Sequence, residues 1–177
     1  MNETSNPAKE FPSRDQTKPG SRSFYAIVDA ARDSSLYGEL RTLGPRCACL
    51  FAGPLEPQIE RAAPYLVLLE PEDAFAKRWA SEGLGQSWGI MFRAEADFGT
   101  VWRHLRKRLE VTLPDGRRVL FRFYDPRVLR DYFLGCRGDE LDFWFQYATA
   151  YWIEAEGGVE LLVFQREGDI IAVAVGR

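Results

Sequence analysis

The first half of the chain alternates short apolar runs with longer amphipathic stretches. Near-continuous apolar runs at residues 23–28, 47–52, 64–69 and 88–92 predict buried strands, because a strand covered on both faces has no polar side to show. Between the first two runs, apolar residues share one helical face: Leu36, Tyr37, Leu40 and Leu43. The alternation of strands and helices up to residue 110 favours a sheet covered by helices.

The middle of the chain carries the clearest helix and the clearest turn. Residues 97–109 place an apolar stripe on one side and arginine and lysine on the rest, which is typical of a surface helix. Asp115 and Gly116 then form the dipeptide most typical of a tight hairpin, with strands predicted at residues 111–113 and 119–124. A hairpin is therefore expected directly after the helix.

The last third of the chain predicts two helices and a meander. Asp125 is placed to cap a helix whose first residue is Pro126, and residues 139–147 follow as a strongly aromatic helix. Three strands joined by glycine-containing turns are predicted at residues 150–154, 159–165 and 170–175. The expected fold class is α/β (α+β), a mixed β-sheet flanked by helices that ends in a C-terminal antiparallel β-meander.

These elements divide the chain of 177 residues into three parts. Residues 1–22 are polar, with too little apolar surface to order themselves, and predict a flexible N-terminal leader. Residues 23–134 predict an α/β domain. Residues 135–177 predict a C-terminal helix plus a β-meander, either packed on the same domain or forming a small lobe.

Charge is unevenly placed along the chain, although its net value of -3 gives no reason to expect a nucleic-acid partner. Residues 100–130 hold nine Arg and Lys against three Asp and Glu, whereas residues 137–169 hold eight acids against two Arg. Surfaces of opposite sign steer a partner of complementary charge. Solvated faces of ordinary helices and strands would give the same pattern.

The sequence lacks the features of a membrane or secreted protein. No apolar run reaches the roughly 20 residues that a membrane span needs, and residues 1–22 lack the apolar segment of a signal peptide. Three cysteines and a single histidine make a Cys/His zinc site improbable and favour reduced thiols. We therefore expect a cytoplasmic protein with no metal, no cofactor and no membrane partner.

The search for catalytic groups finds one weak candidate. His104 is the only histidine, and no recognised motif places a Ser or Cys nucleophile beside it. A small hydrolase that uses His104 as its base stays open as an alternative. A nucleic-acid-binding module built on the basic patch of residues 103–118 is a second alternative. No catalytic residue is assigned, and a binding protein is the main expectation.

Residues 121–127 stand out because they carry two arginines in a largely aromatic run. As a strand, the run would put its two phenylalanines on one face and Arg122 and Tyr124 on the other. Arg127 lies in the first turn of the following helix, where its positive charge interacts unfavourably with the positive end of the helix dipole. Both arginines therefore need a carboxylate or carbonyl partner. An internal salt-bridge network and a direct binding role are both compatible with these residues.

Short pieces in a fixed order carry a family resemblance. They lie at residues 25–31, 36–37, 50–53, 63–69, 88–90, 104–106, 114–116 and 121–129. Together they resemble the effector chaperones, or adaptors, of the bacterial type VI secretion system (Tap/Tec-type) over residues 24–134. The resemblance implies a protein that binds a toxic effector and promotes its loading onto the spike, made of VgrG or a PAAR-type protein. It implies no enzymatic activity.

The family pattern also marks individual positions. They are Asp29, Pro64, Tyr65, Trp88, Gly89, His104, Arg106, Arg122, Asp125, Pro126 and Arg127. The resulting candidates for a protein-binding site or a scaffold junction are Trp88, His104, Arg106, Arg122, Tyr124, Asp125 and Arg127. The resemblance does not say which of them contact a partner.

The region after residue 134 suits recognition of different cargoes, because such adaptors vary there. It is acidic and rich in aromatic side chains, which protein interfaces enrich. The candidate cargo-facing residues are Phe143, Trp144, Tyr147, Tyr151 and Trp152. The alternative is that these side chains fill the core under the meander.

Overall fold

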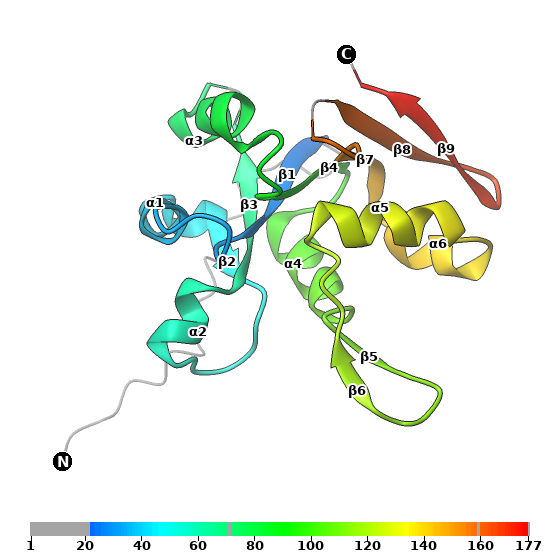
Figure 1. Ribbon diagram of the computed structural model, residues 1–177, viewed down its shortest axis with the longest axis horizontal. Helices are drawn as coiled ribbons and strands as arrows, with labels where there is room; N and C mark the ends of the chain where they lie inside the picture. The colour runs from blue at the N-terminus through cyan, green and yellow to red at the C-terminus, as the bar shows by residue number, and fades with distance from the viewer. Residues whose placement is uncertain (1–21, 71, 159, 177) are drawn as a thin grey trace.

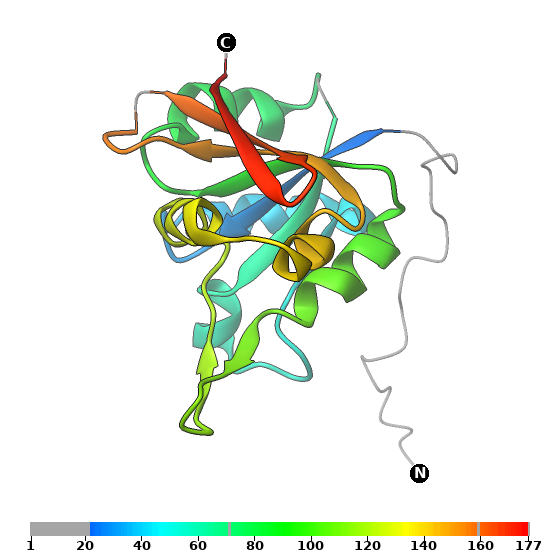
Figure 2. The ribbon, with the colours of Figure 1, turned by 90° about the vertical axis from the view of Figure 1, so that its right-hand side faces the viewer.

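One antiparallel sheet of seven strands forms the centre of the computed structural model, which describes residues 22–70, 72–158 and 160–176 (Figure 1). The predicted leader therefore lies outside the described residues except for Arg22. From edge to edge the strands are β2 (Cys47–Cys49), β3 (Pro64–Leu69), β1 (Ser23–Asp29), β4 (Gly89–Ala94), β7 (Ala148–Glu154), β8 (Leu161–Glu167) and β9 (Ile170–Val175). A separate hairpin, β5 (Glu110–Thr112) and β6 (Arg118–Leu120), projects from the body (Figures 1 and 2).

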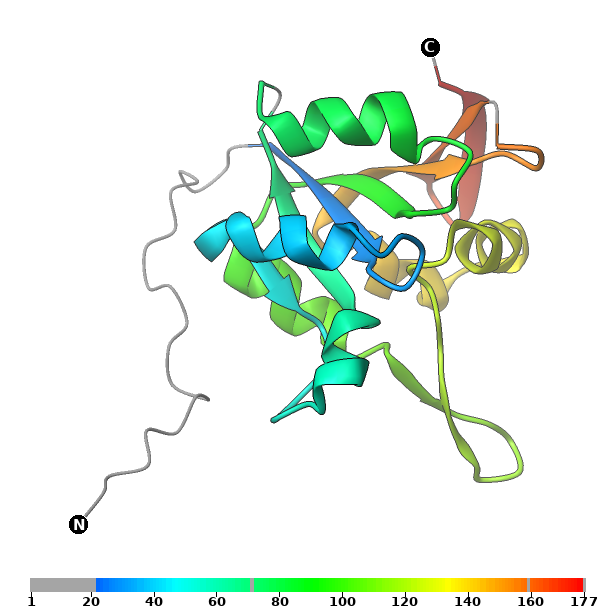
Figure 3. The same ribbon diagram turned by 60° about the vertical axis from the view of Figure 1, so that its left-hand side comes forward.

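Helices lie on both faces of this sheet. One face is covered by α4 (Phe98–Arg106), α5 (Pro126–Gly135) and α6 (Asp139–Trp144). The other is covered over β1 and β3 by α1 (Leu36–Thr42), α3 (Ala74–Arg78) and the π-helical turn η3 (Trp79–Gly83) (Figure 3). The short elements η2 (Gly44–Arg46) and α2 (Pro57–Arg61) lie in the connections on either side of β2. The buried cluster under α1 and α3 includes no residue of β7, β8 or β9.

Strand β1 shows why the central strands are apolar without interruption. Tyr25 and Ile27 point into the cluster under α4 and α5, whereas Ala26 and Val28 point into the cluster under α1 and α3. All four side chains are fully buried. Successive side chains of a strand face opposite sides of the sheet, so a strand with helices on both sides needs apolar residues at every position.

The predicted fold class is confirmed, with one difference in the sheet. Helices flank the sheet, and β7, β8 and β9 form the predicted C-terminal antiparallel meander. All strand pairings in the described part of the chain are antiparallel, so the expected parallel pairs are not found. The helical connections do join strands of like direction, β1 to β2 and β3 to β4. In each case an antiparallel strand lies between the two, and no parallel pair is hydrogen-bonded.

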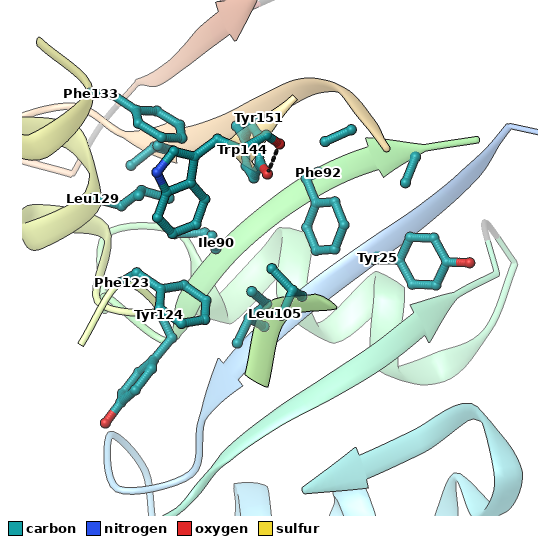
Figure 4. Packing of buried hydrophobic residues seen from close by; sticks show 14 of the residues in the cluster. Tyr25, Ile90, Phe92, Leu105, Phe123, Tyr124, Leu129, Phe133, Trp144 and Tyr151 are labelled. Carbon is teal, nitrogen blue, oxygen red and sulfur yellow. Dashed lines mark hydrogen bonds between the residues drawn. The ribbon is translucent and has the colours of Figure 1, made fainter. Parts of the chain in front are cut away.

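An aromatic core joins the C-terminal elements to the rest of the sheet. Trp144 of α6 is buried against Phe133 of α5 and Tyr151 of β7, with ring centroids 5.6 and 6.5 Å away (Figure 4). The Tyr151 hydroxyl donates to the Trp144 carbonyl oxygen at 2.6 Å. Burial of such large rings supplies much of the stability of a small domain.

Two strands approach so closely at Gly89 that only glycine fits. A Cβ atom at this position would lie 1.8 Å from the carbonyl oxygen of Ile27 on the neighbouring strand. Just beyond it, the Asp29 amide donates to the Trp88 carbonyl oxygen at 2.7 Å. Gly89 thus permits the close pairing that carries Asp29 to the end of the sheet, beside residues 121–127.

Candidate functional site

Residues 121–127, called the junction from here on, connect the projecting hairpin to α5. The predicted strand over residues 119–124 is wrong after Leu120, because β6 ends there and residues 123–124 form a turn. The turn is closed by the Asp125 amide, which donates to the Arg122 carbonyl oxygen at 3.0 Å. Strand alternation does not hold across a turn, so Phe123 and Tyr124 are both buried instead of facing opposite sides. Figure 4 shows Phe123 within the core cluster and Tyr124 at its margin.

The first arginine of the junction binds a buried carboxylate of β1. Arg122 Nη2 donates to Asp29 Oδ2 at 2.8 Å, and Asp29 Oδ1 accepts from the Ala31 amide at 3.1 Å. The Asp29 side chain is 1% exposed, whereas that of Arg122 is 46% exposed. The guanidinium carbon also lies 5.6 Å from the Tyr124 ring centroid. This ion pair ties the junction to the end of β1.

The second arginine binds the residue that caps α5. Asp125 accepts from the Arg127 amide at 3.0 Å, which confirms the predicted N-cap with Pro126 in the first turn. The Arg127 side chain binds the same carboxylate twice, Nε to Oδ1 at 2.9 Å and Nη2 to Oδ2 at 2.6 Å. Burial raises the pKa of Asp125, but the hydrogen bonds from the Arg127 side chain and amide outweigh it and leave the pKa below its ordinary value.

Both arginines of the junction thus have carboxylate partners within the chain. The internal salt-bridge network, one of the two interpretations of the sequence, is present in the structure. A role of Arg122, Tyr124, Asp125 and Arg127 in direct partner contact stays a prediction.

The same end of the sheet holds a third buried acid. Glu154, the last residue of β7, is 6% exposed and accepts from the Ser87 amide at 3.2 Å. Burial raises the pKa of this carboxyl group above its ordinary value. Ser87 has a φ of 53°, a backbone conformation that is uncommon for residues other than glycine. The carboxylate therefore holds the loop before β4 in a strained shape beside the junction.

The backbone of Trp88 lies at the end of the sheet beside the junction, whereas its side chain lies in the buried cluster under α1 and α3. Its carbonyl oxygen binds the Asp29 amide, as described above. Its indole is buried on the opposite face, edge-on to Trp79 at 6.3 Å, with the Arg78 guanidinium 4.9 Å from its ring centroid. In this position Trp88 supports the sheet and offers almost no surface to a partner.

His104 and Arg106 lie on α4, away from the junction. The His104 ring stacks on Phe143 with centroids 4.0 Å apart, and its Nε2 atom lies 2.7 Å from the Phe143 carbonyl oxygen. Burial, opposed by that hydrogen bond, lowers the pKa of His104 below its ordinary value. Arg106 Nε donates to the Leu50 carbonyl oxygen at 3.0 Å, and its guanidinium lies 4.2 Å from the Trp102 ring centroid. Both side chains are held by internal contacts.

The five predicted cargo-facing aromatics divide into three groups. Trp144 and Tyr151 are 1% and 2% exposed, so the core alternative holds for these two and they present no surface to cargo. Phe143 and Tyr147 are partly buried around His104. Trp152 is also partly buried but lies on the other face of the sheet, where its ring is 5.4 Å from that of Phe24. The density of aromatic residues in a sequence does not say which rings point inward. The packing of α6 and the pairing of β7 decide this for Trp144 and Tyr151.

Sequence reasoning missed an apolar groove on that second face. It is lined by Phe24, Leu84, Met91, Trp152, Glu160, Leu161, Val175 and Gly176, which come from β1, β4, β7, β8, β9, two loops and the residue after β9. Its volume is about 650 Å³. Trp152 was the one member singled out from the sequence. The sequence carries no signal for the groove, because Phe24 and Val175 lie in strongly apolar runs typical of buried strands, although they are 42% and 57% exposed in the structure.

Several kinds of site receive no support from the geometry of the described residues. In this part of the chain, no group of three His, Cys, Asp or Glu side chains is placed to hold a metal ion. The cysteines Cys47, Cys49 and Cys136 are free thiols. No helix within the described ranges is long and apolar enough to cross a membrane.

Comparison with known proteins adds one match. The model of a family described as "Domain of unknown function (DUF4123)" matches residues 24–142, which run from β1 into α6 and include the junction. No curated protein and no solved structure matches the chain.

Proposed function

The chain belongs to the family of the DUF4123 domain, and we propose that it acts there as an effector adaptor of a bacterial type VI secretion system. In this role it binds a toxic effector in the cytoplasm of the producing cell. It then promotes loading of that effector onto the spike, formed by VgrG or a PAAR-type protein. The family match over residues 24–142 is the observation that carries the proposal, because it covers the ordered pieces that resemble such adaptors.

The proposal includes stoichiometric binding instead of turnover, and the environment of His104 supports this part. A general base needs access to substrate and a nucleophile within hydrogen-bond reach. His104 is only 8% exposed, and its ring nitrogen Nε2 is hydrogen-bonded to the backbone carbonyl group of Phe143. A hydrolase built on His104 would have to release the ring from Phe143 first.

The distribution of apolar and acidic surface also supports a protein partner. The groove beside Trp152 offers apolar surface to a partner, and the acidic side chain of Glu160 forms part of its lining. The basic patch considered for nucleic acid is partly neutralised, since Arg117 pairs with Asp115 and Arg118 pairs with Glu110. Protein surfaces of this kind favour a basic or mixed partner over a polyanion.

Co-expression with the product of the neighbouring gene tests the proposal. The tagged chain should co-purify with that product in a fixed ratio, and the product should be an effector or a spike protein. The proposal fails if the neighbour is neither of these and nothing co-purifies.

Two variants give the experiment its internal comparison. Arg127→Ala should leave co-purification intact per folded molecule, because Arg127 binds Asp125 within the chain. Loss of the complex in this variant at unchanged folding would assign the junction to the interface. His104→Ala tests the hydrolase alternative, which requires a turnover activity that disappears while the fold and the complex persist.

A further inference from the structure

The two edges of the seven-stranded sheet differ in how their backbone is covered. At one edge, β2 has three residues, and its outward carbonyl group at Cys49 accepts from Trp102 Nε1 at 2.8 Å. Trp102 belongs to α4, so this helix protects the edge. Arg106 of the same helix binds the next carbonyl group, that of Leu50. Short length and a covering helix are the usual protections of an edge strand.

The opposite edge, β9, has neither protection. Its six residues, 170–175, are all apolar, and they pair with β8 in continuous register. In the described part of the sheet no strand lies on the other side of β9. Ile170, Val173 and Val175 are 52%, 44% and 57% exposed. The strand contains no lysine, no proline and no bulge, the devices that keep an edge from pairing with another chain.

The hydrogen-bond pattern shows which backbone groups of β9 face outward. The Gly176 amide donates to the Leu161 carbonyl oxygen at 2.7 Å, so residue 176 directs its backbone groups toward β8. Backbone direction alternates along an antiparallel strand. Residues 174 and 172 therefore also face β8, whereas Ile171, Val173 and Val175 direct their N–H and C=O groups away from the sheet. These three residues form the β9 edge.

Acidic side chains bracket the β9 edge at both ends. Glu167, the last residue of β8, and Asp169, in the turn after it, lie at the start of β9, whereas Glu156 and Glu160 lie in the connection beside its far end, next to Leu161. All four are exposed. The nearest arginine on β8 is Arg166, and it is engaged by Asp142 at 2.6 Å and by the Gly168 carbonyl oxygen at 2.7 Å. An incoming segment therefore meets an apolar strand between two negative turns.

We infer that the β9 edge is the docking site for an extended segment of the partner protein, which adds to the sheet as an eighth strand. The open backbone groups would bind the segment, and the exposed valines would contact its apolar side chains. Charge complementarity calls for Lys or Arg on both sides of that apolar stretch. The identity of the partner, an effector, rests on the proposed function. The recognition chemistry does not rest on it, because it follows from the backbone groups and charges of the β9 edge.

The groove gives the same partner a second contact. Val175 and Gly176 at the end of β9 form part of its lining, together with Trp152 and Leu84. A chain that turns from this end of the β9 edge onto the face of the sheet meets the groove, whose volume of about 650 Å³ accommodates a large apolar side chain. The preferred segment therefore has an aromatic or long aliphatic residue beside its strand-forming part.

Amide hydrogen exchange of the purified complex tests the inference residue by residue. The probe is the partner that co-purifies with the chain from the co-expression described above. Amides of Ile171, Val173 and Val175 should exchange freely in the free chain and become protected at least ten-fold in the complex. Amides of Ala172 and Ala174, which bind β8, should be protected in both states and serve as the internal reference. A complex in which the three outward amides stay unprotected overturns the inference and leaves the proposed function standing.

A pair of variants at one position provides the matched control. Val173→Pro removes an outward N–H group without removing a bond to β8, and proline is tolerated at such edge positions. It should weaken the complex about ten-fold or more. Val173→Thr keeps the N–H group and the strand propensity and should bind nearly as the wild type does. Protection of Ala172 and Ala174 in the proline variant shows that β8 and β9 remain paired; equal binding by both variants contradicts the inference.

Two further outcomes count against it as well. If the free chain is a dimer in solution and its outward β9 amides are already protected, a second copy occupies the edge and the inference is wrong. If no partner co-purifies at all, the proposed function fails, and the docking of an effector on β9 fails with it.

Discussion

The junction and the β9 edge differ in whether their polar groups have partners within the chain. In the junction, Arg122 binds Asp29 and Arg127 binds Asp125, so the two arginines that needed partners find them within the chain. Along β9, the backbone groups of every second residue face outward with no strand beside them in the described sheet. The charged run at residues 121–127 is the more conspicuous of the two in the sequence. The apolar run of β9, however, is the one whose outward N–H and C=O groups face no neighbouring strand in the described sheet.

In the interpretation proposed above, this difference separates a scaffold, the junction, from a contact surface, the β9 edge. Satisfied ion pairs at the end of the sheet fix the position of α5 relative to β1, and their loss should reduce the free energy of unfolding. Open backbone groups on an edge strand contribute little to the stability of the free chain, and their loss should reduce binding. The two regions can therefore be distinguished by measuring stability and binding separately for variants in each.

The largest effect on stability is expected from Arg122→Ala. The variant leaves the Asp29 carboxylate 1% exposed and without its cation, and an unpaired buried charge costs about 3 kcal/mol or more. Urea unfolding at neutral pH should show this loss. Arg118→Ala is the matched control, since Arg118 is 73% exposed in its pair with Glu110 and should change stability by less than about 0.5 kcal/mol. A loss in Arg122→Ala no larger than that of the control would contradict a scaffold role for the junction.

A smaller loss is expected from Asp125→Ala. Removal of the capping carboxylate should cost about 1 to 2 kcal/mol, because α5 loses its N-cap while the largely exposed Arg127 returns to water. The folded state lowers the pKa of Asp125, so its contribution is present above the ordinary value near 3.9 and is lost as the pH falls through the lowered value. Unfolding free energies of wild type and variant should therefore differ at pH 7 and converge in strong acid. A difference that is independent of pH would show that the carboxylate charge contributes nothing.

The pH dependence near neutrality should come from His104. Its pKa is lowered in the folded state, first by burial and further by Lys107 and Arg108, so folding favours the neutral ring. Stability is therefore full above the ordinary value near 6.5 and falls as the pH drops below it, by at most about 1.4 kcal/mol per pH unit for one proton. His104→Phe retains a ring to stack on Phe143 and should abolish this slope. Because the chain has one histidine, an unchanged slope in the variant would exclude His104 as the cause.

Local signals explain which parts of the fold could be predicted. Asp97 and Asp125 each cap the helix expected from the sequence, and the meander at the C-terminus follows from its glycine-containing turns. A cap or a turn depends on a few neighbouring residues, so it can be recognised without the rest of the chain. The antiparallel order of the sheet could not be recognised in this way, because it depends on which strand lies between two others.

The candidate site depended on contacts that are distant in sequence. Arg122 finds its carboxylate at Asp29, 93 positions earlier, and the sequence predicted the need for a partner but not its identity. The same limit applies to the aromatics of β7, where Tyr151 is buried and its neighbour Trp152 reaches the groove on the other face. Side-chain direction on paired strands is a property of register, and register is set by residues from several elements.

The smallest effect on stability, and the sharpest test of the contrast, is expected from Val173→Lys. Val173 is 44% exposed on the free side of β9, so an exposed lysine there should change the free energy of unfolding by less than about 0.5 kcal/mol. A lysine on an edge strand hinders pairing with another strand. The variant should therefore unfold like the wild type and lose the partner in co-purification, whereas Arg122→Ala should unfold more easily and keep the partner at temperatures where it is folded. If the two variants exchange these results, the junction is the contact surface and the β9 edge belongs to the scaffold.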